Sequence, residues 1–143
     1  MSSKFIFFLI LVVLIVGISI FGYFKAIPGV ENQTENLPKI EIRPKVYDFG
    51  EIKFGDVVNY SFLVKNLGNE VLEIKRVATS CACATAKIAK EKINPGEETE
   101  LLVTYDSGSM PLHGSGREER IIYLRSNDPL YPQAEVKIYA TVK

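Results

Sequence analysis

Two cysteines with one residue between them are the part of this sequence best suited to chemistry. Cys81 and Cys83 are the only cysteines among the 143 residues. On an extended strand they would face the same side, with Cα atoms about 6.6 Å apart. That spacing lies at the upper edge of the range of about 4.4 to 6.8 Å found in disulfides. A disulfide here would therefore need a local bend or bulge, and it would be strained and easily reduced.

Three interpretations of the cysteine pair are open from the residues alone. In the first, two small side chains pack near the end of a strand, since free cysteine is among the most buried residue types. In the second, a disulfide serves redox exchange outside the cytoplasm. In the third, two thiolates bind a soft metal such as Cu(I). We favour packing, because a single C-x-C pair is a weak signal for either chemistry.

A two-thiolate metal site needs more ligands, and Met110 and His113 have the suitable softness, since the other methionine is the initiator. Both belong to the irregular glycine-rich segment 107–116. One methionine and one histidine in such a segment are usually solvated or packed. Cys81, Cys83, Met110 and His113 are thus candidate metal ligands, and no bound cofactor is predicted.

Patterns typical of enzymes are missing from the sequence. His113 is the only histidine, and no serine or cysteine pairs with it by spacing. Glu118 and Glu119 adjoin Arg117 and Arg120, an alternation of charge that is normally a solvated face. There is also no phosphate-binding loop, zinc-finger spacing or paired-carboxylate motif. We predict that the protein is not an enzyme and has no small-molecule substrate.

The amino-terminal part of the chain predicts a membrane anchor. Residues 5–24 are uncharged, and twenty residues make about 30 Å of helix, the thickness of the hydrocarbon core. The apolar region of a cleaved signal is usually shorter and ends at a small-residue site. We therefore interpret residues 1–25 as a single-pass anchor rather than a removed signal segment. Lys4 and Lys25 nearly balance the charge rule for orientation, and we expect the following domain on the extracytoplasmic side.

A linker and a β-domain follow the anchor. Residues 26–38 are rich in Pro, Gly and Asn without apolar periodicity, which predicts a flexible linker spanning about 20 Å. From residue 39 onward, apolar and polar residues alternate with period two, most clearly over residues 136–143. Turn-forming segments recur at intervals of about ten residues. Residues 39–143 are thus predicted to form an immunoglobulin-like antiparallel β-sandwich of about seven strands.

The charge of the β-domain excludes one class of partner. After Lys25 the chain has 15 Lys and Arg against 17 Asp and Glu, a formal balance of −2. Binding to nucleic acid requires a concentrated basic face. No nucleic-acid partner is predicted.

Several short motifs of the β-domain, taken in order, resemble the bacterial family called domain of unknown function 1573. That family is similar to the sandwich domains of major sperm protein and of ciliary ASH proteins. The motifs are Tyr47–Ile52, Tyr60–Asn66 with Gly68 and Asn69, Leu72–Ile74, Ser80–Thr85, Ile93–Glu97 and Ser126–Pro129. The family often has glycine between the cysteines, where this chain has Ala82, and segment 107–116 is longer than usual. The resemblance implies an extracytoplasmic bacterial sandwich without an assigned activity.

These observations favour a binding or scaffold function. An anchor, a linker and a sandwich without catalytic groups indicate a domain presented to another envelope protein. The alternative is Cu(I) handling or thiol redox chemistry at Cys81 and Cys83.

Overall fold

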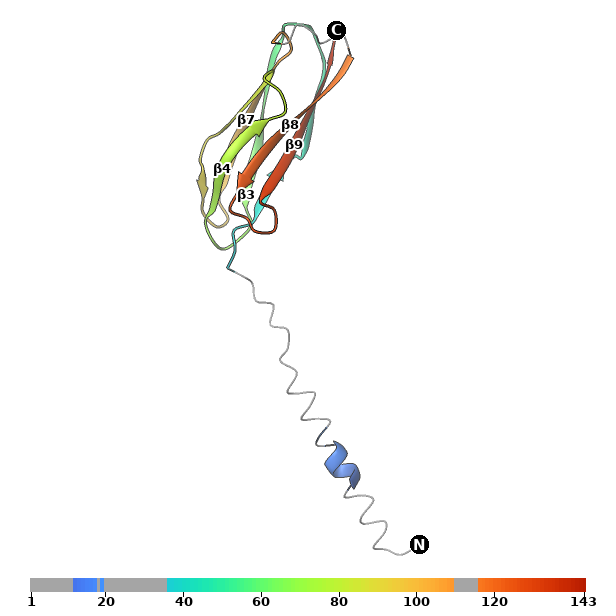
Figure 1. The fold of residues 1–143 in the computed structure, drawn as a ribbon, viewed down its shortest axis with the longest axis vertical. Helices are drawn as coiled ribbons and strands as arrows, with labels where there is room; N and C mark the ends of the chain where they lie inside the picture. The colour runs from blue at the N-terminus through green and yellow to red at the C-terminus, as the bar shows by residue number, and fades with distance from the viewer. Residues whose placement is uncertain (1–11, 18, 20–35, 110–115) are drawn as a thin grey trace, which may run out of the picture. The chain divides into compact units, whose positions relative to one another are not determined.

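The β-domain is a sandwich of two sheets (Figure 1). The computed structural model describes residues 12–17, 19, 36–109 and 116–143. Within them, nine strands lie between Ile40 and Val142. Asn36–Lys143 forms a compact unit with its own hydrophobic core, which is the condition for a domain to fold independently.

The chain crosses between the sheets several times. The four-stranded sheet has the order β1 (Ile40–Arg43), β3 (Val57–Asn66), β7 (Glu98–Asp106) and β5 (Ala84–Ile88). The five-stranded sheet has the order β2 (Val46–Ile52), β9 (Gln133–Val142), β8 (Gly116–Ser126), β4 (Leu72–Thr79) and β6 (Lys92–Ile93). Figure 1 shows β8 and β9 side by side along the length of the domain.

The core lies between the two sheets and follows the period-two pattern of the sequence. The last strand confirms the prediction most clearly, because Val136, Ile138, Ala140 and Val142 are all buried. Phe62 and Val64 of β3 are fully buried against them from the other layer. Successive side chains of a strand point to opposite faces, so each inner face presents its apolar residues to the core.

Two details of the predicted sandwich are wrong. The described residues contain nine strands rather than about seven, because β1 and β6 have only four and two residues, too few for a periodic pattern to identify a strand. The sandwich is also not wholly antiparallel, since β2 pairs with β9 in parallel. Its register shifts between Asp48 and Glu51, where Gly50 has a φ of 72°, a conformation that glycine adopts without steric cost.

The amino-terminal predictions fall mostly outside the described residues. Residues 12–17 and 19 are helical, and in the described part of the chain no helix is long and apolar enough to cross a membrane. The compact unit begins at Asn36, inside the segment predicted as linker. Leu37 is held there by Asn69, whose side-chain oxygen accepts the Leu37 N–H at 3.3 Å.

Candidate functional site

The two cysteines lie in a turn between β4 and β5 rather than on a strand. They form a disulfide with a Cα–Cα distance of 5.3 Å, well inside the usual range of about 4.4 to 6.8 Å. The predicted bend is therefore this turn, by which the chain passes from one sheet to the other. Ala82 adopts an ordinary negative φ, so this turn does not require the glycine found in the family.

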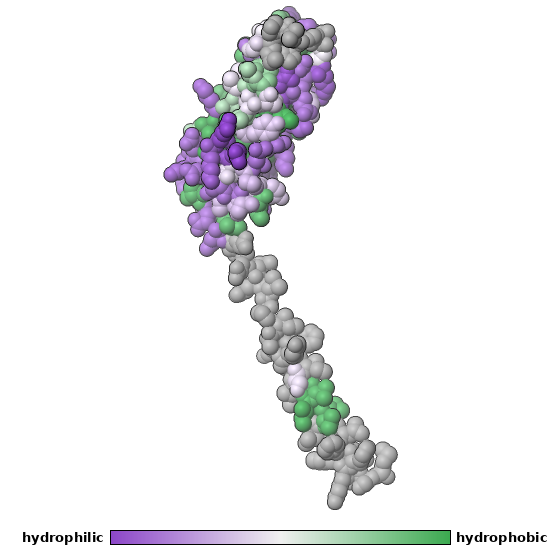
Figure 2. All heavy atoms as spheres, viewed as in Figure 1, coloured by the Kyte–Doolittle hydropathy of each residue, from purple (hydrophilic) through white to green (hydrophobic). Residues whose placement is uncertain are grey.

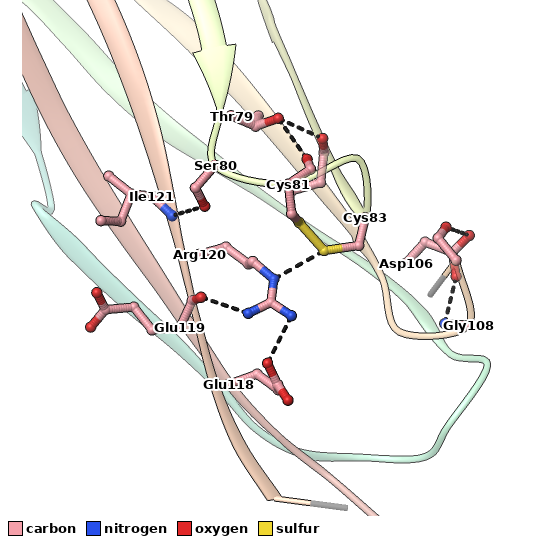
Figure 3. Close-up of a disulfide and its surroundings, with 12 residues drawn as sticks. Thr79, Ser80, Cys81, Cys83, Asp106, Gly108, Glu118, Glu119, Arg120 and Ile121 are labelled. Carbon is pink, nitrogen blue, oxygen red and sulfur yellow. Dashed lines mark hydrogen bonds and ion pairs between the residues drawn. A yellow bond between two sulfur atoms is a disulfide. The ribbon is translucent and has the colours of Figure 1, made fainter. Parts of the chain in front are cut away.

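Hydrogen bonds fix the turn on both sides (Figure 3). The Thr79 hydroxyl lies 2.9 Å from the carbonyl oxygen of Cys81 and 3.0 Å from that of Ala84. Ser80 is paired with Ile121 of β8, whose N–H it accepts at 3.0 Å. The carbonyl of Cys83 accepts the N–H of Asp106 at 2.9 Å. The disulfide is thus tied to β8 in one sheet and to β7 in the other.

A nearly buried arginine contacts the disulfide. Arg120 donates from Nε to Sγ of Cys83 at 3.0 Å, and its Nη2 forms an ion pair with Glu118 at 2.7 Å. The side chains of Arg120 and Glu118 are only 11% and 19% exposed. Cys83 is buried, whereas Cys81 is partly exposed. The sulfur of the buried Cys83 therefore has a positively charged side chain beside it (Figure 3).

The guanidinium group of Arg120 lies over the ring of Tyr105 in β7. The Arg120 Cζ atom is 5.6 Å from the centroid of this ring, a cation–π distance. The Tyr105 hydroxyl is buried without a hydrogen-bond partner among the described residues. Burial raises the pKa of Tyr105, and the charge of Arg120 partly opposes that rise. Tyr105 therefore packs its apolar ring against Arg120 and leaves its hydroxyl oxygen without a hydrogen bond among the described residues.

Replacing Tyr105 by phenylalanine is expected to leave the free energy of unfolding unchanged, or to raise it by up to about 1 kcal/mol, because a buried unpaired hydroxyl costs free energy. The benefit should grow above about pH 10, where an unfolded tyrosine ionises. The raised pKa keeps folded Tyr105 protonated there, so wild-type stability falls as the pH rises. Urea unfolding at neutral and alkaline pH measures both effects.

Thr79→Val serves as the control, because it removes a hydroxyl that is hydrogen-bonded. It should lose about 1 kcal/mol. A similar loss in Tyr105→Phe would show that the tyrosine hydroxyl has a partner.

The predicted metal ligands are only partly brought together. Cys81 and Cys83 are joined as a disulfide, so neither sulfur is a thiolate. Met110 and His113 lie outside the described residues. Over residues 36–109 and 116–143, no group of three or more His, Cys, Asp and Glu side chains is placed to hold a metal ion. The four-residue Cu(I) site stays a prediction that concerns the reduced protein.

Sequence analysis missed Arg120 as a site residue. We assigned it to a solvated face, which is wrong for Arg120 and Glu118. The signal lay in the same strand, since counting back by two from buried Leu124 and Ile122 reaches exactly these inward positions. The charged residue types suggested exposure, whereas the period-two pattern indicated inward positions. The pattern was the better guide here, because charged side chains that form an ion pair can be buried.

A second feature is a groove of about 380 Å³ between β1 and β9. Ile40, Ile42 and Ala134 give it an apolar floor, and charged side chains flank it. Three large apolar side chains lie exposed on or beside its rim, with exposed fractions of 46% for Leu67, 67% for Leu130 and 60% for Tyr131.

Asp128 holds one end of the groove in place. It is 1% exposed, and its carboxylate accepts the N–H groups of Ile40 at 2.9 Å, Leu130 at 2.8 Å and Tyr131 at 3.0 Å. Asp128 thus forms the turn between β8 and β9 and also links this turn to β1.

The two packed sheets form an immunoglobulin-like β-sandwich. Residues 40–142 match the family described as "Protein of unknown function (DUF1573)", and the chain belongs to this family. The resemblance inferred from its motifs is thereby confirmed. No curated protein sequence matches the chain.

Solved structures with the same fold come from diverse proteins. A protein of unknown function from Porphyromonas gingivalis W83 is 25% identical, with a TM-score of 0.66 over 73% of this chain and 46% of its own. The ASH/PapD-like domain 7 of human CEP192 is 10% identical, with a TM-score of 0.55 over 76% of this chain and 87% of its own. The YadV chaperone is 16% identical, with a TM-score of 0.53 over 73% of this chain and 52% of its own. The chain thus spans about half the length of two of these three.

Proposed function

We propose that this chain is a membrane-anchored, extracytoplasmic binding domain that docks an apolar segment of another envelope protein in the groove between β1 and β9. The observation that carries the proposal is the cluster of Leu67, Leu130 and Tyr131, each more than two-fifths exposed, on and beside the rim of that groove. Apolar patches rimmed by polar residues are typical of interaction sites.

Side chains rather than main-chain bonds would supply the affinity. β1 is an edge strand of four residues, which is short for pairing with an added strand. The N–H of Ile40 is also already bonded to Asp128. A partner would therefore bind by inserting apolar side chains against Ile42 and Ala134, with the three exposed residues folding over them.

The rest of the proposal follows from the sequence. The uncharged segment 5–24 has the length of a membrane span, and family membership favours a domain outside the cytoplasm. A protein partner, rather than a nucleic acid or a small substrate, fits the balanced charge and the open groove. The proposed activity is binding, without catalysis.

Site-specific photo-cross-linking in the native membrane tests the groove. A photoreactive amino acid in place of Tyr131, in the full-length chain, is expected to give one discrete cross-linked partner, and Leu67→Glu should abolish it. Phe54 is the matched control position, because it is 56% exposed and lies near the carboxyl-terminal end, where its N–H is bonded to Lys143.

Equal cross-linking from both positions, or none from either, would contradict the groove as a docking site. Accessibility of the domain to protease added outside the cytoplasmic membrane tests its location. A chain protected until the membrane is opened would contradict the extracytoplasmic assignment.

Thiol–disulfide exchange is a second candidate function, and the contact between Arg120 and Cys83 favours it. A thiolate of another protein would attack Sγ of Cys81, the less buried of the two cysteines. The S–S bond would break, and its electron pair would leave on Cys83 as a thiolate beside the guanidinium group. A second thiolate would then attack the partner's sulfur in this mixed disulfide. That step releases the first partner as a disulfide and leaves Cys81 as a second thiolate, which completes a two-electron reduction of the pair. A cationic neighbour favours the thiolate and so the leaving group.

A further inference from the structure

Two arginines face each other on the outer side of the five-stranded sheet. Arg76 of β4 lies directly opposite Arg125 of β8 in the antiparallel register. The other three of the five arginines each form an ion pair with a carboxylate, whereas these two form none with any residue in 36–109 or 116–143. Like charges directly opposite each other destabilise a sheet, so stability alone does not explain the arrangement.

A bulge in β4 adds a third positive charge. The register of β4 against β8 shifts between Ile74 and Arg76. Before the shift, buried Leu72 and Ile74 place Lys75 on the outer face, and after it, Val77 packs against the core and places Arg76 there too. Both basic residues are exposed. Bulges re-aim side chains and are frequent next to functional sites.

The arginines border a shallow pocket of about 250 Å³, which Ala78, Tyr123 and Gln133 complete. Ala78 and Tyr123 are half-buried and lie opposite each other two residues further along the strands, on the same face of the sheet. Figure 2 shows that the β-domain is largely hydrophilic on the side where Figure 1 places β4, β8 and β9 nearest the viewer. The pocket thus combines a positively charged edge with a small apolar floor.

We propose that this pocket binds the carboxylate of an acidic side chain in an extended segment of a partner protein. The guanidinium fork matches a carboxylate with two parallel hydrogen bonds, and a ligand carboxylate would relieve the repulsion between Arg76 and Arg125. The floor of Ala78 and Tyr123 accommodates the methylene groups of a glutamate. The acid beside the pocket, Glu135, already accepts the Gln133 amide at 3.3 Å.

The site is distinct from the groove of the proposed function. Gln133 lines both features, so they are neighbours, but the arginine site lies on the outer face of the sheet and the groove at its edge. Its occupancy does not require that the groove be filled.

Binding of a short oligoglutamate peptide with blocked ends tests the proposal, followed by NMR on Asn36–Lys143. The peptide is expected to cause saturable shifts at Arg76, Ala78, Tyr123 and Arg125, while the matching oligoglutamine peptide causes none. Arg76→Gln and Arg125→Gln should each weaken binding about tenfold, as expected for the loss of one charged hydrogen-bonded contact.

Lys87→Gln is the matched control, because Lys87 is an exposed cation on β5 of the other sheet. The affinity of this variant for the oligoglutamate peptide should equal that of the wild type. Equal weakening in Lys87→Gln would reduce the effect to net charge and overturn the proposal. The absence of saturable shifts would also overturn the proposal. So would a competition experiment in which inorganic phosphate binds at the pocket and the oligoglutamate peptide does not displace it.

Discussion

Replacing Asn66 by alanine is expected to lower the free energy of unfolding by about 3 to 5 kcal/mol, a loss at the upper end for single substitutions. Asn66 is fully buried. Its Nδ2 donates to the carbonyls of Glu70 at 2.7 Å and Ile93 at 2.9 Å. Its Oδ1 accepts the N–H groups of Gly68 at 2.9 Å and Lys39 at 3.2 Å. Alanine would leave all four backbone groups without this partner, and the carbonyl of Ile93 would lose a fully buried hydrogen bond.

Asn69→Ala is the control for this prediction, because it removes the same amide from the same turn where the amide is exposed. Its oxygen accepts the N–H of Leu37 at 3.3 Å and its Nδ2 donates to the Asn36 side chain at 3.1 Å. Both bonds are exposed, so a loss below about 1 kcal/mol is expected. Urea unfolding of Asn36–Lys143 followed by circular dichroism gives both values. Equal losses in the two variants would mean that Asn66 acts as an ordinary turn residue.

The turn around Asn66 illustrates what the sequence could predict. The asparagine and glycine residues of segment 66–69 are typical of a turn, and β3 does end at Asn66. The importance of Asn66 was not predictable, because turn residues are usually exposed, whereas its partners Lys39 and Ile93 are both 27 positions away. Gly68 is similar, since a Cβ there would lie 2.1 Å from the carbonyl oxygen of Leu37. Only the packed chain reveals that requirement.

The candidate site divides in the same way. The C-x-C pair and the need for a bend were visible from spacing, because strand geometry fixes the distance between alternate residues. The identity of the neighbours was not, since Arg120 reaches the disulfide from β8 and Tyr105 of β7 lies against the Arg120 guanidinium group. Period two gave the correct inner face of β9 but could not reveal that β2 runs parallel to it. Alternation is the same in parallel and antiparallel strands that have one buried face.

Arg120 is expected to control how fast the disulfide is reduced. Because its Nε lies 3.0 Å from Sγ of Cys83, the guanidinium stabilises the thiolate that leaves when Cys81 is attacked. The double variant Arg120→Gln with Glu118→Gln removes this charge without leaving its carboxylate partner unpaired. We expect its disulfide to be reduced by dithiothreitol about tenfold more slowly than that of the wild type. Stopped-flow reduction with thiol counting measures the rate.

A rate change alone could reflect a looser fold, so a second measurement has to separate chemistry from structure. In the reduced protein, alkylation of the thiols by iodoacetamide should require a higher pH in the double variant, because the thiolate has lost its cationic neighbour. Arg117→Gln is the control, since Arg117 is an exposed arginine of the same strand that pairs with Asp48 and does not contact the disulfide. If the double variant and Arg117→Gln share one pH profile, the contact between Arg120 and Cys83 is only packing. If the profile moves in the double variant alone, the buried cation sets the reactivity of the pair, and redox exchange at Cys81 becomes the better account of the site.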